Sequence, residues 1–144
     1  MNIKNHTSEI PASTSQARIE KRLVSAGAKN ILKSYDDNQT CNAISFILPV
    51  DGKQLTFQLP AKVEEIYNAL VAEYTRPTPR SFEICRQQAE RTAWKIISDW
   101  VDIQLTMIAL EQAEVLQMFF PFLTNGKETF YQRIKNDDFK LLSK

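Results

Sequence analysis

The stretch from Cys41 to Pro60 places the strongest constraint on the fold, because two alternating segments flank a two-residue turn. Large apolar side chains recur at every second position: Ile44, Phe46 and Leu48 in the first segment, and Leu55, Phe57 and Leu59 in the second. Asp51-Gly52 between them is typical of a tight hairpin turn, since both positions tolerate positive φ. The stretch therefore predicts two antiparallel strands that share one apolar face.

The residues before this hairpin predict a third strand. Asn30–Tyr35 suits a short strand, and the polar run 36–39 provides a turn into the next one. We therefore expect a three-stranded antiparallel meander. A lone sheet of this size is only marginally stable in water, so other elements must cover its apolar face.

An N-terminal helix is expected ahead of the sheet. Ser13 followed by Gln16 has the spacing of a capping box, which predicts that the helix begins after a cap at Ser13. Gly27 is suited to end the helix, because glycine adopts the left-handed backbone conformation that other residues resist.

Beyond the sheet, the sequence predicts a helical half. Apolar residues recur at helical spacing over 61–74, and the proline-containing connector Arg76–Arg80 ends that helix. A long helix then runs from about Ser81 to about Gln112, and its broad apolar stripe is typical of a central helix. A shorter apolar segment over 115–123, which Pro121 interrupts, and a final short helix over 128–134 complete the chain.

The expected fold is therefore α+β, with the N-terminal helix and the meander packed against a C-terminal helical half that contains one long central helix. Of the 144 residues, 43% are hydrophobic and 24% are charged, which is typical of a globular chain with one core. We expect a flexible arm over 1–12, a single domain over 13–135 and a charged tail over 136–144.

Residues that carry chemistry are scarce in this chain. His6 is the only histidine and lies in the expected arm, and Cys41 and Cys85 are far apart in the sequence. No zinc site or activated nucleophile of usual spacing follows from these residues, so we expect no catalytic site, no cofactor and no metal. Both cysteines are expected to be buried free thiols.

The sequence favours a cytoplasmic protein. Met1–Ser15 is polar and lacks the apolar run of a signal peptide. No segment reaches the roughly 20 apolar residues that a membrane helix needs, so no membrane association is expected.

Two groups of basic residues form the candidate functional surface: Arg18, Lys21 and Arg22 in the first, and Arg76, Arg80, Arg86, Arg91 and Lys95 in the second. The net charge of the chain is only +1, so their local arrangement matters more than the total. The long helix is basic at its start and acidic further on, which opposes the helix dipole and favours a partner at the basic end. Phosphate groups or carboxylates of a neighbouring subunit are candidate partners, and a plain solvated face is the structural alternative.

Large apolar residues outside the sheet form a candidate interface: Trp94, Met118, Phe119 and Phe122. Trp94 and Trp100 are six residues apart and so lie on different sides of the long helix, with at least one of them in the core. The run 118–122 either closes the open face of the sheet or forms a contact in a homo-oligomer.

Six short motifs are spread over the chain: Ser25-Ala26-Gly27-Ala28-Lys29-Asn30-Ile31, Tyr35-Asp36, Ala43-Ile44-Ser45-Phe46, Phe57-Gln58-Leu59-Pro60, Arg91-Thr92-Ala93-Trp94-Lys95-Ile96 and Asp99-Trp100-Val101. Together they resemble a group of small bacteriophage and prophage proteins, over a span from about Arg18 to Phe130. The resemblance implies a setting in DNA replication, in recombination or in blocking host defences. It transfers no catalytic residues to this chain.

The leading hypothesis is a non-enzymatic phage accessory protein that binds nucleic acid or a nucleoprotein complex through its basic groups. The alternative is an inhibitor that docks on a host protein such as a defence factor. An enzyme whose distant carboxylates meet only in the fold is the third class. The expected partners are thus nucleic acid or a host or phage protein, with homo-oligomer formation and action in the host cytoplasm.

Overall fold

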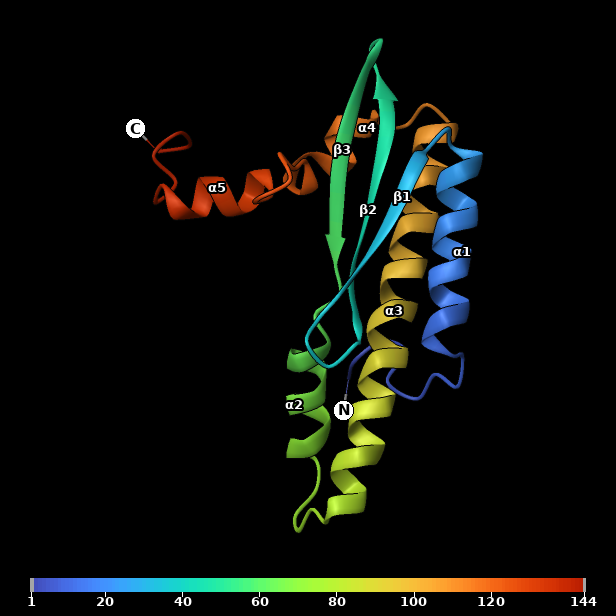
Figure 1. Ribbon diagram of the computed structural model, residues 1–144, viewed down its shortest axis with the longest axis vertical. Helices are drawn as coiled ribbons and strands as arrows, with labels where there is room; N and C mark the ends of the chain where they lie inside the picture. Colours follow the sequence, from blue (N-terminus) through green and yellow to red (C-terminus); the bar gives the residue numbers. More distant parts are fainter. Residues whose placement is uncertain (1, 144) are drawn as a thin grey trace. The chain divides into compact units, whose positions relative to one another are not determined.

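The computed structural model describes residues 2–143 and has an α+β fold (Figure 1). In chain order the elements are α1 (Ala12–Ser25), β1 (Lys29–Tyr35), β2 (Cys41–Val50), β3 (Lys53–Pro60), α2 (Val63–Ala72), α3 (Pro79–Ala109), α4 (Val115–Phe119), the 3-10 helix η1 (Phe120–Phe122) and α5 (Phe130–Asn136). The N-terminal helix, the antiparallel sheet and the helical C-terminal half with one long helix confirm the predicted fold class.

The chain forms two compact units. Unit 1 contains the described residues up to Arg22 together with Ala61–Ile103. Unit 2 contains Leu23–Pro60 and the described residues from Gln104 onward. Because α1 and α3 each contribute residues to both units, the division does not decide between one domain and two, and a single domain over 13–135 stays a prediction.

The sheet of unit 2 has the strand order β1-β2-β3, and both pairs are antiparallel. The hairpin between β2 and β3 turns at Asp51 and Gly52, whose φ angles are 51° and 81°. Two positive φ angles in a two-residue loop match the right-handed twist of the flanking strands, so the predicted turn is confirmed. On the far side of β3, the N–H of Thr124 donates to the carbonyl of Thr56 at 2.9 Å and covers part of that edge.

Three phenylalanines form the centre of unit 2. Phe46 and Phe57 are directly paired across β2 and β3, and their ring centroids are 5.7 Å apart. Phe119 of α4 lies 5.9 Å from each of them, with all three side chains fully buried. The segment 118–122 therefore closes the apolar face of the sheet through Phe119, which was one of the two roles predicted for it.

The predicted cap of α1 at Ser13 is wrong. The helix begins at Ala12, so Ser13 lies inside its first turn rather than before it. The carbonyl of Pro11 accepts hydrogen bonds from the N–H groups of Thr14 and Ser15, at 3.0 and 3.2 Å. A backbone carbonyl thus starts the helix two residues before the predicted cap.

The long helix α3 begins two residues earlier than predicted. Pro79 is its first residue, where its fixed φ suits a helix and its missing N–H costs no hydrogen bond. Thr78 caps this end, since its Oγ1 accepts the N–H of Ser81 at 3.2 Å, and Ser81 Oγ accepts the N–H of Thr78 at 3.1 Å. This reciprocal pair is a capping box built from two hydroxyl groups.

The same helix ends three residues earlier than predicted, at Ala109 instead of Gln112. Glu111 takes a left-handed conformation with φ of 59°, and the N–H of Gln112 donates to the carbonyl of Met107 at 2.9 Å. These features match the Schellman motif at the C-terminus of a helix, in which the left-handed residue is usually glycine. The sequence did not predict this helix end, because glutamate rarely adopts the left-handed conformation that Glu111 has here.

Neither cysteine forms a disulfide, and both are buried, as predicted. No helix among residues 2–143 has the length and apolar character needed to cross a membrane. In unit 2, α5 extends away from the strands (Figure 1), and hydrogen-bonded turns continue beyond Asn136 to Leu142.

Candidate nucleic-acid interface

All eight predicted basic residues lie in unit 1. Four of them are exposed, namely Arg18, Lys21, Arg76 and Arg80, and four are half-buried, namely Arg22, Arg86, Arg91 and Lys95. The half-buried residues each have protein partners, which decide how far they are available to a ligand.

Arg86 joins α3 to α2. Its guanidinium donates to both carboxylate oxygens of Glu64, at 2.6 and 3.3 Å, and lies 3.8 Å from the centre of the Tyr67 ring. The hydrogen bond from Arg86 lowers the pKa of Glu64, and the same bond raises the pKa of Arg86. A bidentate pair with a stacked ring orients the guanidinium toward α2, so we assign Arg86 to holding the two helices together.

Arg22 joins α1 to α3. Its Nε donates to Asp102 Oδ1 at 2.9 Å, and both side chains keep contact with solvent. Arg18 lies one helical turn before Arg22 on the same face of α1, and Lys21 is its neighbour at the i+3 position. The first basic group therefore lies beside the part of α3 that contains Asp102.

Arg91 is occupied by a segment near the N-terminus, Lys4–Ser8, which we call the strap. Arg91 Nε and Gln88 Nε2 both donate to the carbonyl oxygen of Ser8, at 3.2 and 3.1 Å. Thr92 Oγ1 donates to the carbonyl of Asn5 at 2.9 Å and accepts from Gln88 Nε2 at 3.0 Å. Two backbone carbonyls of the strap are thus held by a polar stripe on α3. Mobility of the arm over 1–12 stays a prediction.

A second contact of the strap involves Asp99. Lys95 Nζ donates to Asp99 Oδ1 at 2.5 Å, Asn5 Nδ2 donates to its Oδ2 at 2.9 Å, and Lys4 lies 4.0 Å away. Partial burial acts to raise the pKa of Asp99, but the hydrogen bonds from Lys95 and Asn5 and the charges of Lys95 and Lys4 outweigh it. The pKa of Asp99 is therefore below its ordinary value, and the carboxylate holds Lys95 in place.

The helical repeat shows which basic residues share a side of α3. At about 100° per residue, Arg80, Arg91, Lys95 and Asp102 all fall within an arc of about 60°. Arg86 lies about 160° from Asp102, on the opposite side. At about 1.5 Å per residue, Arg80 is about 33 Å from Asp102 along the axis. Arg80, Arg91 and Lys95 of the second group, but not Arg86, therefore share a side of α3 with Asp102, the partner of Arg22 in the first group.

Neither the strap nor the residues of α3 that bind it were predicted as a site. The interacting residues of α3 are Gln88, Arg91, Thr92, Lys95 and Asp99, and their spacing of three or four residues places them on one side of the helix. That spacing was visible in the sequence as a polar stripe. Its occupant was not, because the stripe binds backbone carbonyls that any residue provides.

The candidate interface residues differ in exposure. Trp94 and Phe119 are fully buried within the chain, whereas Met118 and Phe122 are half-buried. A second protein would therefore reach Met118 and Phe122 first. A homo-oligomeric contact through these residues stays a prediction.

Unit 1 and unit 2 each have a pocket. One, in unit 1, has a volume of about 260 Å³ and is lined by His6, Leu70, Glu73, Tyr74, Ile84, Cys85 and Gln88. Burial raises the pKa of the Cys85 thiol, which disfavours the reactive thiolate.

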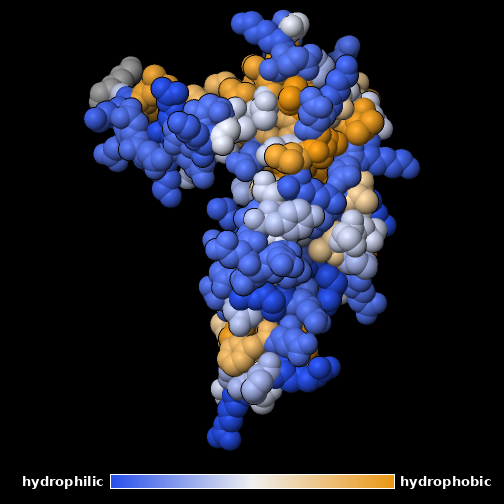
Figure 2. All heavy atoms as spheres, viewed as in Figure 1, coloured by the Kyte–Doolittle hydropathy of each residue, from blue (hydrophilic) through white to orange (hydrophobic). Residues whose placement is uncertain are grey.

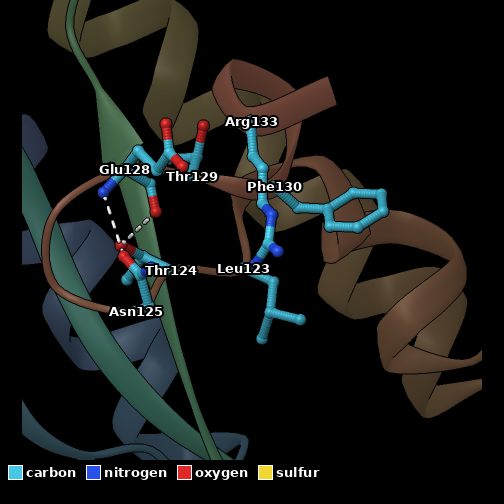
Figure 3. Close-up of a pocket in the computed structure, with 7 residues that line it drawn as sticks. All are labelled: Leu123, Thr124, Asn125, Glu128, Thr129, Phe130 and Arg133. Carbon is cyan, nitrogen blue, oxygen red and sulfur yellow. Dashed lines mark hydrogen bonds between the residues drawn. The ribbon is translucent and has the colours of Figure 1, made fainter. Parts of the chain in front are cut away.

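The pocket in unit 2 has a volume of about 150 Å³ and lies beside the turn 124–129, with the Arg133 side chain directed toward Leu123 (Figure 3). Its Thr124 and Asn125 side chains already accept or donate bonds within the turn.

Hydrophilic side chains cover most of unit 1 on the face shown in Figure 2, apart from a small hydrophobic patch over α2. In unit 2, the same view shows hydrophobic side chains gathered over the strands. Within residues 2–143, no cluster of three or more His, Cys, Asp or Glu side chains is arranged to hold a metal ion. The face of unit 1 shown in Figure 2 is thus mainly hydrophilic.

Comparisons of the chain with protein-family models, curated proteins and solved structures found no match. The resemblance to small phage proteins therefore stays a prediction.

Proposed function

We propose that this chain is a non-enzymatic binding protein that contacts the phosphate backbone of nucleic acid through one side of unit 1. The observation that supports this proposal is the shared side of α3 on which Arg80, Arg91 and Lys95 lie. The bond from Arg22 to Asp102 brings α1, with Arg18 and Lys21, to the far end of that side. Phosphate contacts need cations distributed along a surface rather than a pocket or a catalytic centre.

The separation of the two groups suits an extended polyanion. About 33 Å of helix length separates Arg80 from the level of Asp102, and duplex DNA carries one charge per about 1.7 Å of its axis. The exposed residues Arg18, Lys21, Arg76 and Arg80 supply four cations at the two ends of this span. Contacts through the backbone alone carry no sequence information, so the proposal predicts binding that is largely independent of sequence.

The biological setting belongs to the same proposal. A phage accessory role in replication or recombination would use a sequence-independent contact to nucleic acid or to a nucleoprotein complex. In that setting the protein acts in the host cytoplasm, and a homo-oligomer would multiply the small number of phosphate contacts that each chain provides.

The test is fluorescence anisotropy of labelled single-stranded and duplex DNA at several salt concentrations. With four phosphate contacts, the plot of log affinity against log salt has a slope of about −3 to −4. The double variants Arg18→Ala/Lys21→Ala and Arg76→Ala/Arg80→Ala should each reduce that slope by about 2, because each removes two cations that release counterions.

The matched control is Lys135→Ala/Lys140→Ala, which removes two exposed cations from unit 2. It should leave the slope within about 0.5 of the wild-type value. Affinity that is indifferent to salt, or that falls equally in all three double variants, contradicts the proposed surface.

A second candidate function, an inhibitor that docks on a host protein, is favoured by a different observation. Phe139, Leu141 and Leu142 are exposed by 42%, 70% and 71%, which places three large apolar side chains in solvent near the C-terminal end. Co-purification of one stoichiometric protein, retained at high salt and lost in Leu141→Ser/Leu142→Ser, would support this function over the first.

A further inference from the structure

We propose that the position of the Ser8 carbonyl oxygen is a phosphate subsite that the strap occupies until nucleic acid displaces it. This inference rests on the proposed function and adds a gate to it. The strap, Lys4–Ser8, would then compete with the ligand for the middle of the basic side of α3.

The donors at this position suit a phosphate oxygen. Gln88 Nε2 and Arg91 Nε converge on the single Ser8 oxygen, at 3.1 and 3.2 Å, and Arg91 Nη2 is held by Gln88 Oε1 at 2.6 Å. The guanidinium is therefore oriented before any ligand arrives. A charged phosphate oxygen forms a shorter and stronger hydrogen bond with a guanidinium than a neutral carbonyl does.

The contacts that hold the strap favour exchange. The bonds from Gln88, Arg91 and Thr92 all go to backbone carbonyls, and Asn5 binds Asp99 through its amide. Such bonds can be replaced by bonds to water or ligand at small net cost, unlike buried apolar contacts. Asn5 also has a left-handed conformation, with φ of 63°.

Displacement would connect the two basic groups. Arg91 lies 11 residues from both Arg80 and Asp102, about 16 Å along α3 from each. Freed from Ser8, it would present a cation midway between the exposed ends of the surface. The ligand would gain one phosphate contact, and the salt slope would steepen by about 0.9.

The first experiment compares DNA binding of the full chain with a variant that lacks residues 2–8. Deletion removes Lys4, so a purely electrostatic effect would weaken binding. We expect the opposite, an affinity about tenfold tighter, which corresponds to a site that is open about 10% of the time in the full chain. Adding Arg91→Ala to the deletion should abolish this gain and restore the wild-type slope.

A second variant keeps every charge. Thr92→Val preserves side-chain shape but removes the donor to the Asn5 carbonyl and one acceptor of Gln88 Nε2. The strap therefore loosens, while the bond between Arg91 and Gln88 and the bonds of both residues to Ser8 are retained. We expect an affinity two- to fivefold tighter than that of the full chain. This variant keeps the proposal testable if the chain that lacks residues 2–8 fails to fold.

An independent measurement reports opening without DNA. Cys85 lies in the pocket that His6 of the strap lines, and it is only 3% exposed. In a Cys41→Ser background, Cys85 is the single thiol. Its rate of modification by a small thiol reagent should rise at least fivefold in Thr92→Val, and it should rise in the full chain when DNA is added.

The outcomes separate the two proposals. Salt-dependent binding by the full chain, with no gain in either strap variant and unchanged Cys85 modification, overturns the gate and leaves the proposed function standing. Absence of binding by the full chain with binding gained in the deletion supports the gate. No binding by the full chain or by the strap variants at low salt overturns both.

Discussion

Unit 1 and unit 2 both bury apolar side chains, but they differ in the polar and aromatic contacts between their elements. In unit 1, helices and the strap are joined by directed polar contacts, such as Arg86 to Glu64 and Arg22 to Asp102. In unit 2, the sheet and α4 are joined by a cluster of three buried aromatic rings at Phe46, Phe57 and Phe119. The first kind of contact depends on partners that water or a ligand can replace, and the second depends on area removed from water.

This difference indicates which unit can exchange its contacts for those of a partner. A surface ion pair contributes little net stability, because both charges remain well solvated when they separate. Opening a contact between packed rings exposes a large apolar area and leaves a cavity. The comparison therefore places the contacts that a ligand can replace in unit 1.

The largest expected effect comes from unit 2. Phe57→Ala removes a fully buried ring between Phe46 and Phe119, and we expect it to lower the free energy of unfolding by about 3–5 kcal/mol. Urea unfolding followed by circular dichroism measures the loss. Leu142→Ala, at an exposed position, is the control and should change stability by less than about 0.5 kcal/mol. A loss below about 1 kcal/mol in Phe57→Ala would show that the aromatic cluster is not a main source of the stability of unit 2.

The next effect comes from the carboxylate that receives the strap. Asp99→Asn removes the charge that Lys95 and Asn5 bind, and we expect it to lower the free energy of unfolding at pH 7 by about 1 kcal/mol. The folded-state pKa of Asp99 is lowered, so its contribution is complete above the unfolded pKa, about 3.9. The contribution is lost as the pH falls through the folded value.

The measurement is the urea midpoint of wild type and Asp99→Asn between pH 3 and pH 7. The two midpoints should differ most at pH 6–7 and converge below about pH 4. Asp138→Asn, at an exposed carboxylate of unit 2, controls for the loss of one negative charge. A difference that stays constant across this range would show that Asp99 acts through packing and not through its charge.

Sequence patterns predicted unit 2 better than unit 1, for a physical reason. Alternation over β2 and β3 and the turn at Asp51-Gly52 both act locally, so the hairpin can be predicted from one stretch of chain. The end of α1 is local as well. Gly27 has φ of 97°, and the N–H of Ala28 bonds to the Leu23 carbonyl, as glycine at that position predicts.

The errors and omissions concern backbone groups whose partners have no sequence pattern. The start of α1 depends on the Pro11 carbonyl, and the end of α3 depends on a left-handed Glu111. The strap is bound through the carbonyls of Asn5 and Ser8. Periodicity predicted the apolar stripe of the long helix, but it does not show whether solvent, ligand or the chain itself occupies a polar stripe beside it.

The smallest expected effects separate two arginines of α3. Arg86→Ala should lower the melting temperature by on the order of 2–4 °C, because it unlinks α2 from α3, and it should leave DNA affinity unchanged. Arg80→Ala should leave the melting temperature unchanged and weaken DNA binding about threefold, with a salt slope shallower by about 0.9. Differential scanning fluorimetry and anisotropy on the same preparations measure both quantities. Equal losses of DNA affinity in the two variants would show that the side of α3 does not matter, and the proposed surface would then have no geometric basis.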